Sequence, residues 1–187
     1  MDTRTDCAFV ETGAKADESC LKNTGCSSLS FRHLCSMSTS APDLTHRSPR
    51  SARAKLGGYV ILPRMLDKGR AAIVGKSGEY HYDCPMDQHI LKFLNIAAPA
   101  LLKELKKGKG DGEILAWIKK NQKNKHQPWE IELWSSYHEK RGPDSDQETA
   151  AFFTGRLVEL GAAKREDIKT WFDLLDLDDH VTFGGKP

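Results

Sequence analysis

The stretch LPRMLDKGRAAIVG, residues 62–75, carries the start and stop signals of a complete helix. Pro63 stands near its start, where the missing N–H of proline costs no hydrogen bond, and Gly75 stands at its end. Six more segments show helical spacing of apolar residues between short glycine or proline breaks, at residues 84–95, 98–108, 111–122, 128–142, 145–161 and 165–177. This pattern predicts a mainly α protein with a single compact domain of about six or seven helices. Four tryptophans fall on the apolar faces of these segments and are expected in the core: Trp117, Trp129, Trp134 and Trp171.

The first 43 residues lack this pattern. Apolar residues occur singly there, so the segment cannot bury enough surface to offset the entropy of ordering. We therefore expect a disordered N-terminal extension over residues 1–43, followed by an all-helical domain over residues 44–187. An alternative is that translation starts at Met37, which opens a stretch resembling a natural N-terminus. Four of the five cysteines lie in this extension at spacings that match no zinc site, and we predict neither a metal nor a cofactor.

The composition is that of a soluble globular protein. The chain has 187 residues, of which 39% are hydrophobic and 29% charged, and its net charge is +2. No stretch approaches the roughly 18 apolar residues that span a bilayer, and the N-terminus lacks the apolar run of a secretory signal. We therefore expect a cytoplasmic protein with reduced thiols and no contact with a membrane.

Charge is distributed unevenly along the chain. Residues 44–78 hold eight lysines or arginines and one acidic residue, whereas residues 144–179 hold ten acidic and four basic residues. One interpretation is intramolecular, with basic N-terminal helices docking on acidic C-terminal ones.

The other interpretation is a binding site for a small anionic ligand or an acidic protein segment. Three arginines flank Gly57 and Gly58, whose bare backbone amides would approach a phosphate or carboxylate. The candidate ligand-binding residues are Arg50, Arg53, Arg64, Lys68, Arg70, Tyr59, Tyr80, Tyr82 and Asp87. Nucleic acid is not indicated, because no helix-turn-helix or RNA-binding motif accompanies the basic residues.

A second candidate site lies in GEYHYDCPMDQH, residues 78–89. Pro85 favours the first helical position, which makes Cys84 the N-cap of the helix that follows. Cysteine is not a preferred cap, and a thiol at the positive end of a helix has one ingredient of a reactive thiolate. His81 is the nearest base in sequence, so Cys84 and His81 are the candidate catalytic residues. The opposing interpretation is a small, buried and inert cysteine, with Asp87 assisting the helix cap.

Several short segments of this chain resemble one family. They are PRS at 49–51, LGGY at 56–59, LPR at 62–64, DK at 67–68, RA at 70–71, GEY at 78–80, Tyr82, and CPMD at 84–87. In this pattern the chain is similar to the bacterial domain of unknown function 5069 family of uncharacterised proteins. The resemblance covers roughly residues 44–180, is strongest over 48–94, and implies membership without implying an activity.

Two functional hypotheses follow. The first, which we favour from the sequence, is a non-catalytic helical domain that binds a small anionic ligand or an acidic protein partner. The alternative is a thiol-dependent enzyme or redox sensor built on Cys84. A cleft that brings Cys84, His81 and Arg64 together would favour the alternative, whereas burial of the Cys84 sulfur would favour the first.

Overall fold

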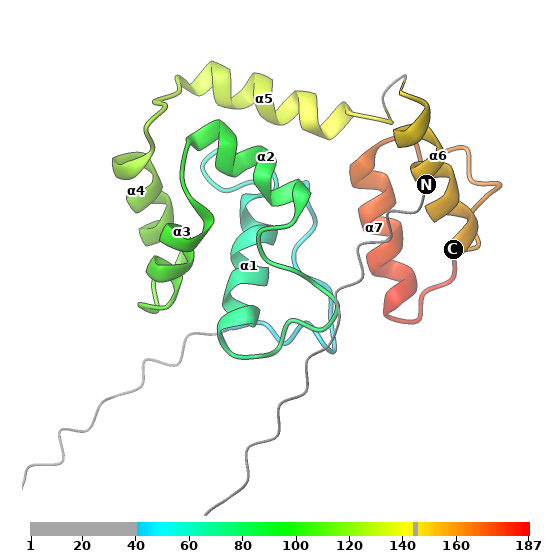
Figure 1. Cartoon of the computed structure of the whole chain (residues 1–187), viewed down its shortest axis with the longest axis horizontal. Helices are drawn as coiled ribbons and strands as arrows, with labels where there is room; N and C mark the ends of the chain where they lie inside the picture. The colour runs from blue at the N-terminus through cyan, green and yellow to red at the C-terminus, as the bar shows by residue number, and fades with distance from the viewer. Residues whose placement is uncertain (1–40, 144–145) are drawn as a thin grey trace, which may run out of the picture. The chain divides into compact units, whose positions relative to one another are not determined.

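The computed structural model describes residues 41–143 and 146–187, and it confirms the mainly α fold (Figure 1). Within these ranges the chain forms seven helices: α1 (Leu62–Ile73), α2 (Pro85–Leu94), α3 (Ala98–Leu105), α4 (Asp111–Asn121), α5 (Pro128–Lys140), α6 (Gln147–Glu159) and α7 (Trp171–Thr182). In the described part, β pairing is limited to one isolated bridge between Leu56 and Tyr59. None of these helices is both long enough and apolar enough to cross a membrane.

The predicted N-terminal extension falls almost entirely outside the described residues. The alternative start at Met37 and the cysteines at positions 7, 20, 26 and 35 lie there too. Of residues 1–43, only the last three are described. Pro42 is buried, and the Asp43 carboxylate pairs with Lys76 at 2.9 Å, so these residues take part in the packing of the domain.

Proline and glycine mark the helix boundaries as the sequence predicts. Helices α1, α2, α3 and α5 each have a proline within their first two positions, where no intrahelical N–H donor is needed. Gly75 and Gly108 follow α1 and α3 at φ +68° and +79°. Side chains disfavour this left-handed conformation, which is why glycine stands at these ends.

The last helix begins later than the prediction of residues 165–177. Thr170 is its N-cap and accepts a hydrogen bond from the backbone N–H of Asp173, while Asp173 accepts one from the N–H of Thr170. This reciprocal pair is a capping box, in which two free N–H groups of the first turn are satisfied. Arg165 and Asp167 pair with each other before the helix starts. The prediction missed the Thr-x-x-Asp signal and placed the start six residues too early.

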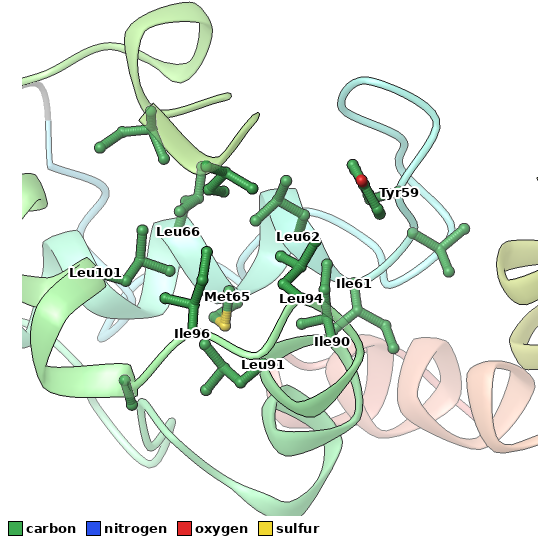
Figure 2. Close-up of a cluster of buried hydrophobic side chains, with 14 of the residues drawn as sticks. Tyr59, Ile61, Leu62, Met65, Leu66, Ile90, Leu91, Leu94, Ile96 and Leu101 are labelled. Carbon is green, nitrogen blue, oxygen red and sulfur yellow. The ribbon is translucent and has the colours of Figure 1, made fainter. Parts of the chain in front are cut away.

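The main core forms around α1. Figure 2 shows apolar side chains of α1 and of the preceding segment meeting side chains from α2 and α3, among them Leu62, Met65, Ile90, Leu94 and Leu101. Gly69 lets α3 approach α1, because a Cβ atom at this position would lie 2.6 Å from Cδ1 of Leu105. A smaller cluster joins α6 to α7 through Phe153, Leu157, Leu174 and Leu177.

Ion pairs join the basic N-terminal part to α7. Both Arg64 Nη atoms donate to the Asp179 carboxylate, at 2.6 and 2.8 Å, and both residues are buried. Arg53 pairs with Asp173 and Asp176. These pairs confirm the intramolecular interpretation of the uneven charge.

The tryptophans are not all in the core. Trp117, Trp134 and Trp171 are partly buried and pack against the apolar clusters. Trp129 is 62% exposed, so the prediction is wrong for this residue. Helix α5 carries apolar residues on two faces, and the helical period alone does not show which face meets the core.

Two histidines lie where α2 and α5 meet. The ring centroids of His89 and His138 are 5.0 Å apart, and Nη1 of Arg141 lies 3.1 Å from Nε2 of His89. Burial lowers the pKa of His138 to about 4, and the neighbouring His89 and Arg141 side chains act in the same direction. The pKa of His89 is also lowered, chiefly by burial. Both rings are therefore neutral at pH 7.

Lowering the pH from 7.5 to 5 is expected to reduce the free energy of unfolding by about 2 kcal/mol through His138. Below the ordinary pKa of 6.5 the unfolded chain binds a proton that the folded chain does not bind until about pH 4, so acid favours unfolding. Urea unfolding across this pH range measures the effect. The loss should be smaller in His138→Gln, which cannot titrate, and unchanged in His46→Gln, which alters an exposed ring. Equal pH dependence in wild type and His138→Gln would contradict this expectation.

Candidate functional site

Cys84 is the N-cap of α2, as predicted. Its backbone is extended, at φ −70° and ψ 168°, and Pro85 follows in the first turn. Asp83, immediately before it, has φ +69°. This left-handed conformation is uncommon for a residue other than glycine and is held by its surroundings. Cys84 is half-buried, and its thiol forms no disulfide.

A buried lysine contacts the sulfur. Nζ of Lys68, from the middle of α1, donates a hydrogen bond to Sγ of Cys84 at 3.1 Å. The same Nζ lies 2.9 Å from Oδ1 of Asp87, the third residue of α2. Lys68 is 4% exposed and Asp87 is fully buried. Lys68 therefore links a buried carboxylate to the thiol of a half-buried cysteine.

Asp87 also stabilises the turn that carries Cys84. Its Oδ2 accepts a hydrogen bond from the backbone N–H of Asp83 at 3.0 Å. Burial raises the pKa of Asp87, and the charge of Lys68 acts in the opposite direction. Taking two charges out of water is costly unless geometry and hydrogen bonds compensate. Such buried charges with a perturbed pKa beside a cleft are often found at functional sites.

A hollow of about 350 Å³ opens beside this group. Five residues predicted at two separate sites line it together: Arg64, Lys68, Tyr80, His81 and Cys84. The hydroxyl of Tyr80 donates to Asp179 at 2.8 Å, and the Arg64 guanidinium lies over the Tyr80 ring at 5.4 Å from its centroid. Burial, with the hydrogen bond to Asp179, raises the pKa of Tyr80. The hollow therefore combines a thiol, two cations and an aromatic ring.

The far wall of the hollow was not predicted. It includes Arg156 of α6 and Leu175, Asp178 and Thr182 of α7. Arg156 pairs with Asp178 at 2.9 Å. No local motif marks these residues, because they reach the hollow only through the packing of α6 and α7.

Three of the predicted anion-binding arginines have carboxylate partners elsewhere. Arg50 pairs with Asp67 at 2.8 Å and with Asp111 at 2.6 Å, and Arg70 pairs with Asp111 at 2.7 Å. Arg53 is bound by α7, as described above. These guanidinium groups already have anionic partners within the chain, and an external anion would compete with them.

The remaining predicted residues lie in different surroundings. Tyr59 is buried in the core, where burial raises its pKa, and Tyr82 donates its hydroxyl to the carbonyl oxygen of Ala98 at 2.9 Å. A separate hollow of about 560 Å³ lies beside Gly57 and Gly58, and its cationic side chains are Lys55 and Lys119 rather than the three arginines. In the described ranges, no group of three or more His, Cys, Asp or Glu residues is arranged to hold a metal ion.

Most of the chain matches the model of a known protein family. A family model described as a domain of unknown function (DUF5069) matches residues 46–181. No curated protein matches the chain. The matched range contains Cys84, Lys68, Asp87 and every side chain that lines the hollow except Thr182.

Proposed function

We propose that this chain, which belongs to the family described as a domain of unknown function (DUF5069), is a thiol-dependent protein with Cys84 as its nucleophile. The observation that carries the proposal is the 3.1 Å contact between Lys68 Nζ and Cys84 Sγ at the edge of an open hollow. This arrangement brings Cys84, His81 and Arg64 to one cleft, which is the feature that favours a thiol function over simple binding.

The chemistry requires a thiolate, because the thiolate and not the thiol is the nucleophile. The Lys68 ammonium, held in place by Asp87, stabilises negative charge on the sulfur. The N-terminus of α2 acts in the same direction through its free N–H groups. The thiolate would attack an electrophilic carbon to form an S–C bond, with the displaced group leaving with the electron pair. With hydrogen peroxide as oxidant, it would instead take one oxygen to form a sulfenic acid and release hydroxide.

The charges around the hollow limit the kind of ligand that it would accept. Arg64, Lys68 and Arg156 each pair with a carboxylate of the chain, Asp179, Asp87 and Asp178 respectively, so an anionic group on a ligand would compete with these carboxylates. His81 is an exposed side chain on the same hollow. Asp178 and Glu79 also line the hollow, so a highly charged anion would be repelled. A working thiol has to stay reduced, as thiols do in the cytoplasm, which supports a cytoplasmic location.

The rate of Cys84 alkylation by iodoacetamide tests this proposal. At pH 7 we expect Cys84 to react about tenfold faster in the folded chain than in the same chain unfolded in urea. Peptide mass spectrometry separates Cys84 from the other four cysteines. Lys68→Met should remove the acceleration, and Lys92→Met, an exposed lysine on the same helix as Cys84, should keep it. If Cys84 reacts no faster in the folded chain than in the unfolded one, the proposal is overturned, and this comparison needs no variant to fold.

A non-catalytic binding domain for a small anion is the second candidate function, and the hollow beside Gly57 and Gly58 favours it. Both glycines have positive φ, at +61° and +89°, in a turn closed by Leu56 and Tyr59. Lys119 lines the same hollow and is exposed. Titration with inorganic phosphate should shift the NMR signals of the Gly57 and Gly58 amides, and the shift should weaken in Lys119→Gln. Unchanged glycine signals in the wild-type chain would exclude this site.

A further inference from the structure

Helix α5 presents an apolar stripe to solvent. Trp129, Leu133 and Tyr137 are 62%, 64% and 58% exposed. They are spaced four residues apart, so they lie on one face of the helix, one above the other. Large apolar side chains that gather on one exposed face usually mark an interaction surface.

The stripe is not the face that holds α5 to the rest of the domain. Ser135 and His138 are buried, and Ile131 and Trp134 pack against the main core. These four residues lie on the opposite side of the helix, given about 100° of rotation per residue. The stripe is therefore not needed to hold α5 in place or to complete the core.

We propose that this stripe binds a second copy of the chain, with the two α5 helices packed antiparallel about a two-fold axis that crosses the stripe midway between Leu133 and Tyr137, at the height of position 135 along the helix. A two-fold axis there pairs position 133 with 137 and position 130 with 140. Leu133 then meets the partner's Tyr137, and Glu130 meets the partner's Lys140. The first pair brings two apolar side chains together, and the second brings opposite charges together. A single position of the two-fold axis therefore makes both contacts favourable.

Within residues 41–143 and 146–187, neither Glu130 nor Lys140 forms an ion pair that would compete with this pairing. Glu130 uses Oε2 to accept the backbone N–H of Gln127, which leaves Oε1 available. Lys140 is exposed at the last position of α5. At this position a cation also interacts favourably with the C-terminal end of its own helix.

A depression on the same surface lies where Trp129 of the second copy would pack in this arrangement. Leu133, Ser136, Tyr137, Lys140 and Arg141 line a shallow depression of about 350 Å³. With the axis at 135, position 129 faces position 141, so the partner's Trp129 lies over this depression. Tryptophan seated in a pocket is a frequent source of binding energy in protein interfaces.

The size of the contact sets the strength of the dimer. Three exposed apolar side chains on each copy, with a charged pair at each end, make a smaller interface than the roughly 800 Å² per partner of a stable complex. We therefore expect a reversible dimer with a dissociation constant on the order of micromolar. Nothing in this contact involves Cys84 or its hollow, so the inference stands apart from the proposed thiol function.

Sedimentation equilibrium of the full chain tests the inference. The wild-type chain should shift from monomer to dimer as its concentration rises through the micromolar range. Leu133→Glu places a charge at the centre of the contact and should raise the dissociation constant at least tenfold. Phe152→Ser removes an equally exposed apolar side chain, 60% exposed on α6, and should leave dimerisation unchanged. A chain that is monomeric at all concentrations, or a dimer that persists in Leu133→Glu, would overturn the inference.

A zero-length carbodiimide cross-link checks the register. Within one helix Glu130 and Lys140 lie about 15 Å apart, too far for a direct amide bond. A peptide that joins Glu130 to Lys140 can therefore come only from two copies. We expect this peptide in the dimer band, and a dimer that lacks it would overturn the antiparallel arrangement.

Discussion

Replacing Arg64 with alanine is expected to lower the free energy of unfolding by about 3 to 5 kcal/mol. Arg64 is 4% exposed and donates two hydrogen bonds to Asp179, which is buried as well. Removal of the guanidinium leaves the Asp179 carboxylate buried with no cation, although Tyr80 still donates one hydrogen bond to it. It also breaks the link between α1 and α7. Urea unfolding followed by circular dichroism measures the loss.

Two further variants show whether the loss comes from the buried pair. Arg165→Ala removes an exposed arginine whose partner Asp167 is also exposed, and it should change stability little. Arg64→Met combined with Asp179→Leu removes both charges and should recover part of the stability lost in Arg64→Ala, because no buried charge is left alone. If Arg64→Ala is no less stable than Arg165→Ala, the pair does not hold α7 to α1.

Replacing Asp87 with alanine is also expected to lower the free energy of unfolding by about 3 to 5 kcal/mol. The carboxylate is fully buried and pairs with Lys68, which is itself buried. Without it the ammonium has the Cys84 sulfur as its remaining contact, and the turn at Asp83 loses a hydrogen-bond acceptor. Thermal unfolding of Asp87→Ala and of Glu79→Ala, an exposed acid on the same hollow, gives the comparison.

Lys68 and Asp87 should also be coupled. The double variant Lys68→Met with Asp87→Leu should lose clearly less free energy of unfolding than the sum of the losses in the two single variants. Each single change leaves one buried charge without its partner, whereas the double change leaves none. Additive losses would mean that the two side chains stabilise the fold independently. They would also remove the argument that Asp87 positions Lys68 at the Cys84 sulfur.

The helices were predictable because their signals are local. Pro63, Pro85 and Pro99 fix φ and lack an N–H, so each is readable as a helix start from its own position. Gly75 and Gly108 are readable as ends for a similar reason. The start of α7 was missed although its signal, Thr170 with Asp173, is equally local. Ile168 stands at helical spacing from Trp171 and Phe172, so the apolar pattern runs back past this cap.

The candidate site was only partly predictable. Cys84 as an N-cap followed from Pro85 alone, and the uneven charge indicated contacts between the two ends of the chain. The group that contacts the Cys84 sulfur is Lys68, which the sequence placed in a different site. Lys68 and Cys84 are 16 positions apart, and nothing near either one indicates the other.

The helical fold, most of the helix boundaries and the position of Cys84 at a helix start can be inferred from the amino-acid sequence. These features depend on backbone hydrogen bonds and dihedral angles within a few residues. Which charges meet depends instead on how the helices pack. Arg64 and Asp179 are 115 positions apart, and they pair because the packing of α7 on α1 brings them together. The exposure of Trp129 was decided in the same way, since helical periodicity gives α5 two apolar faces and only packing selects the one that is buried.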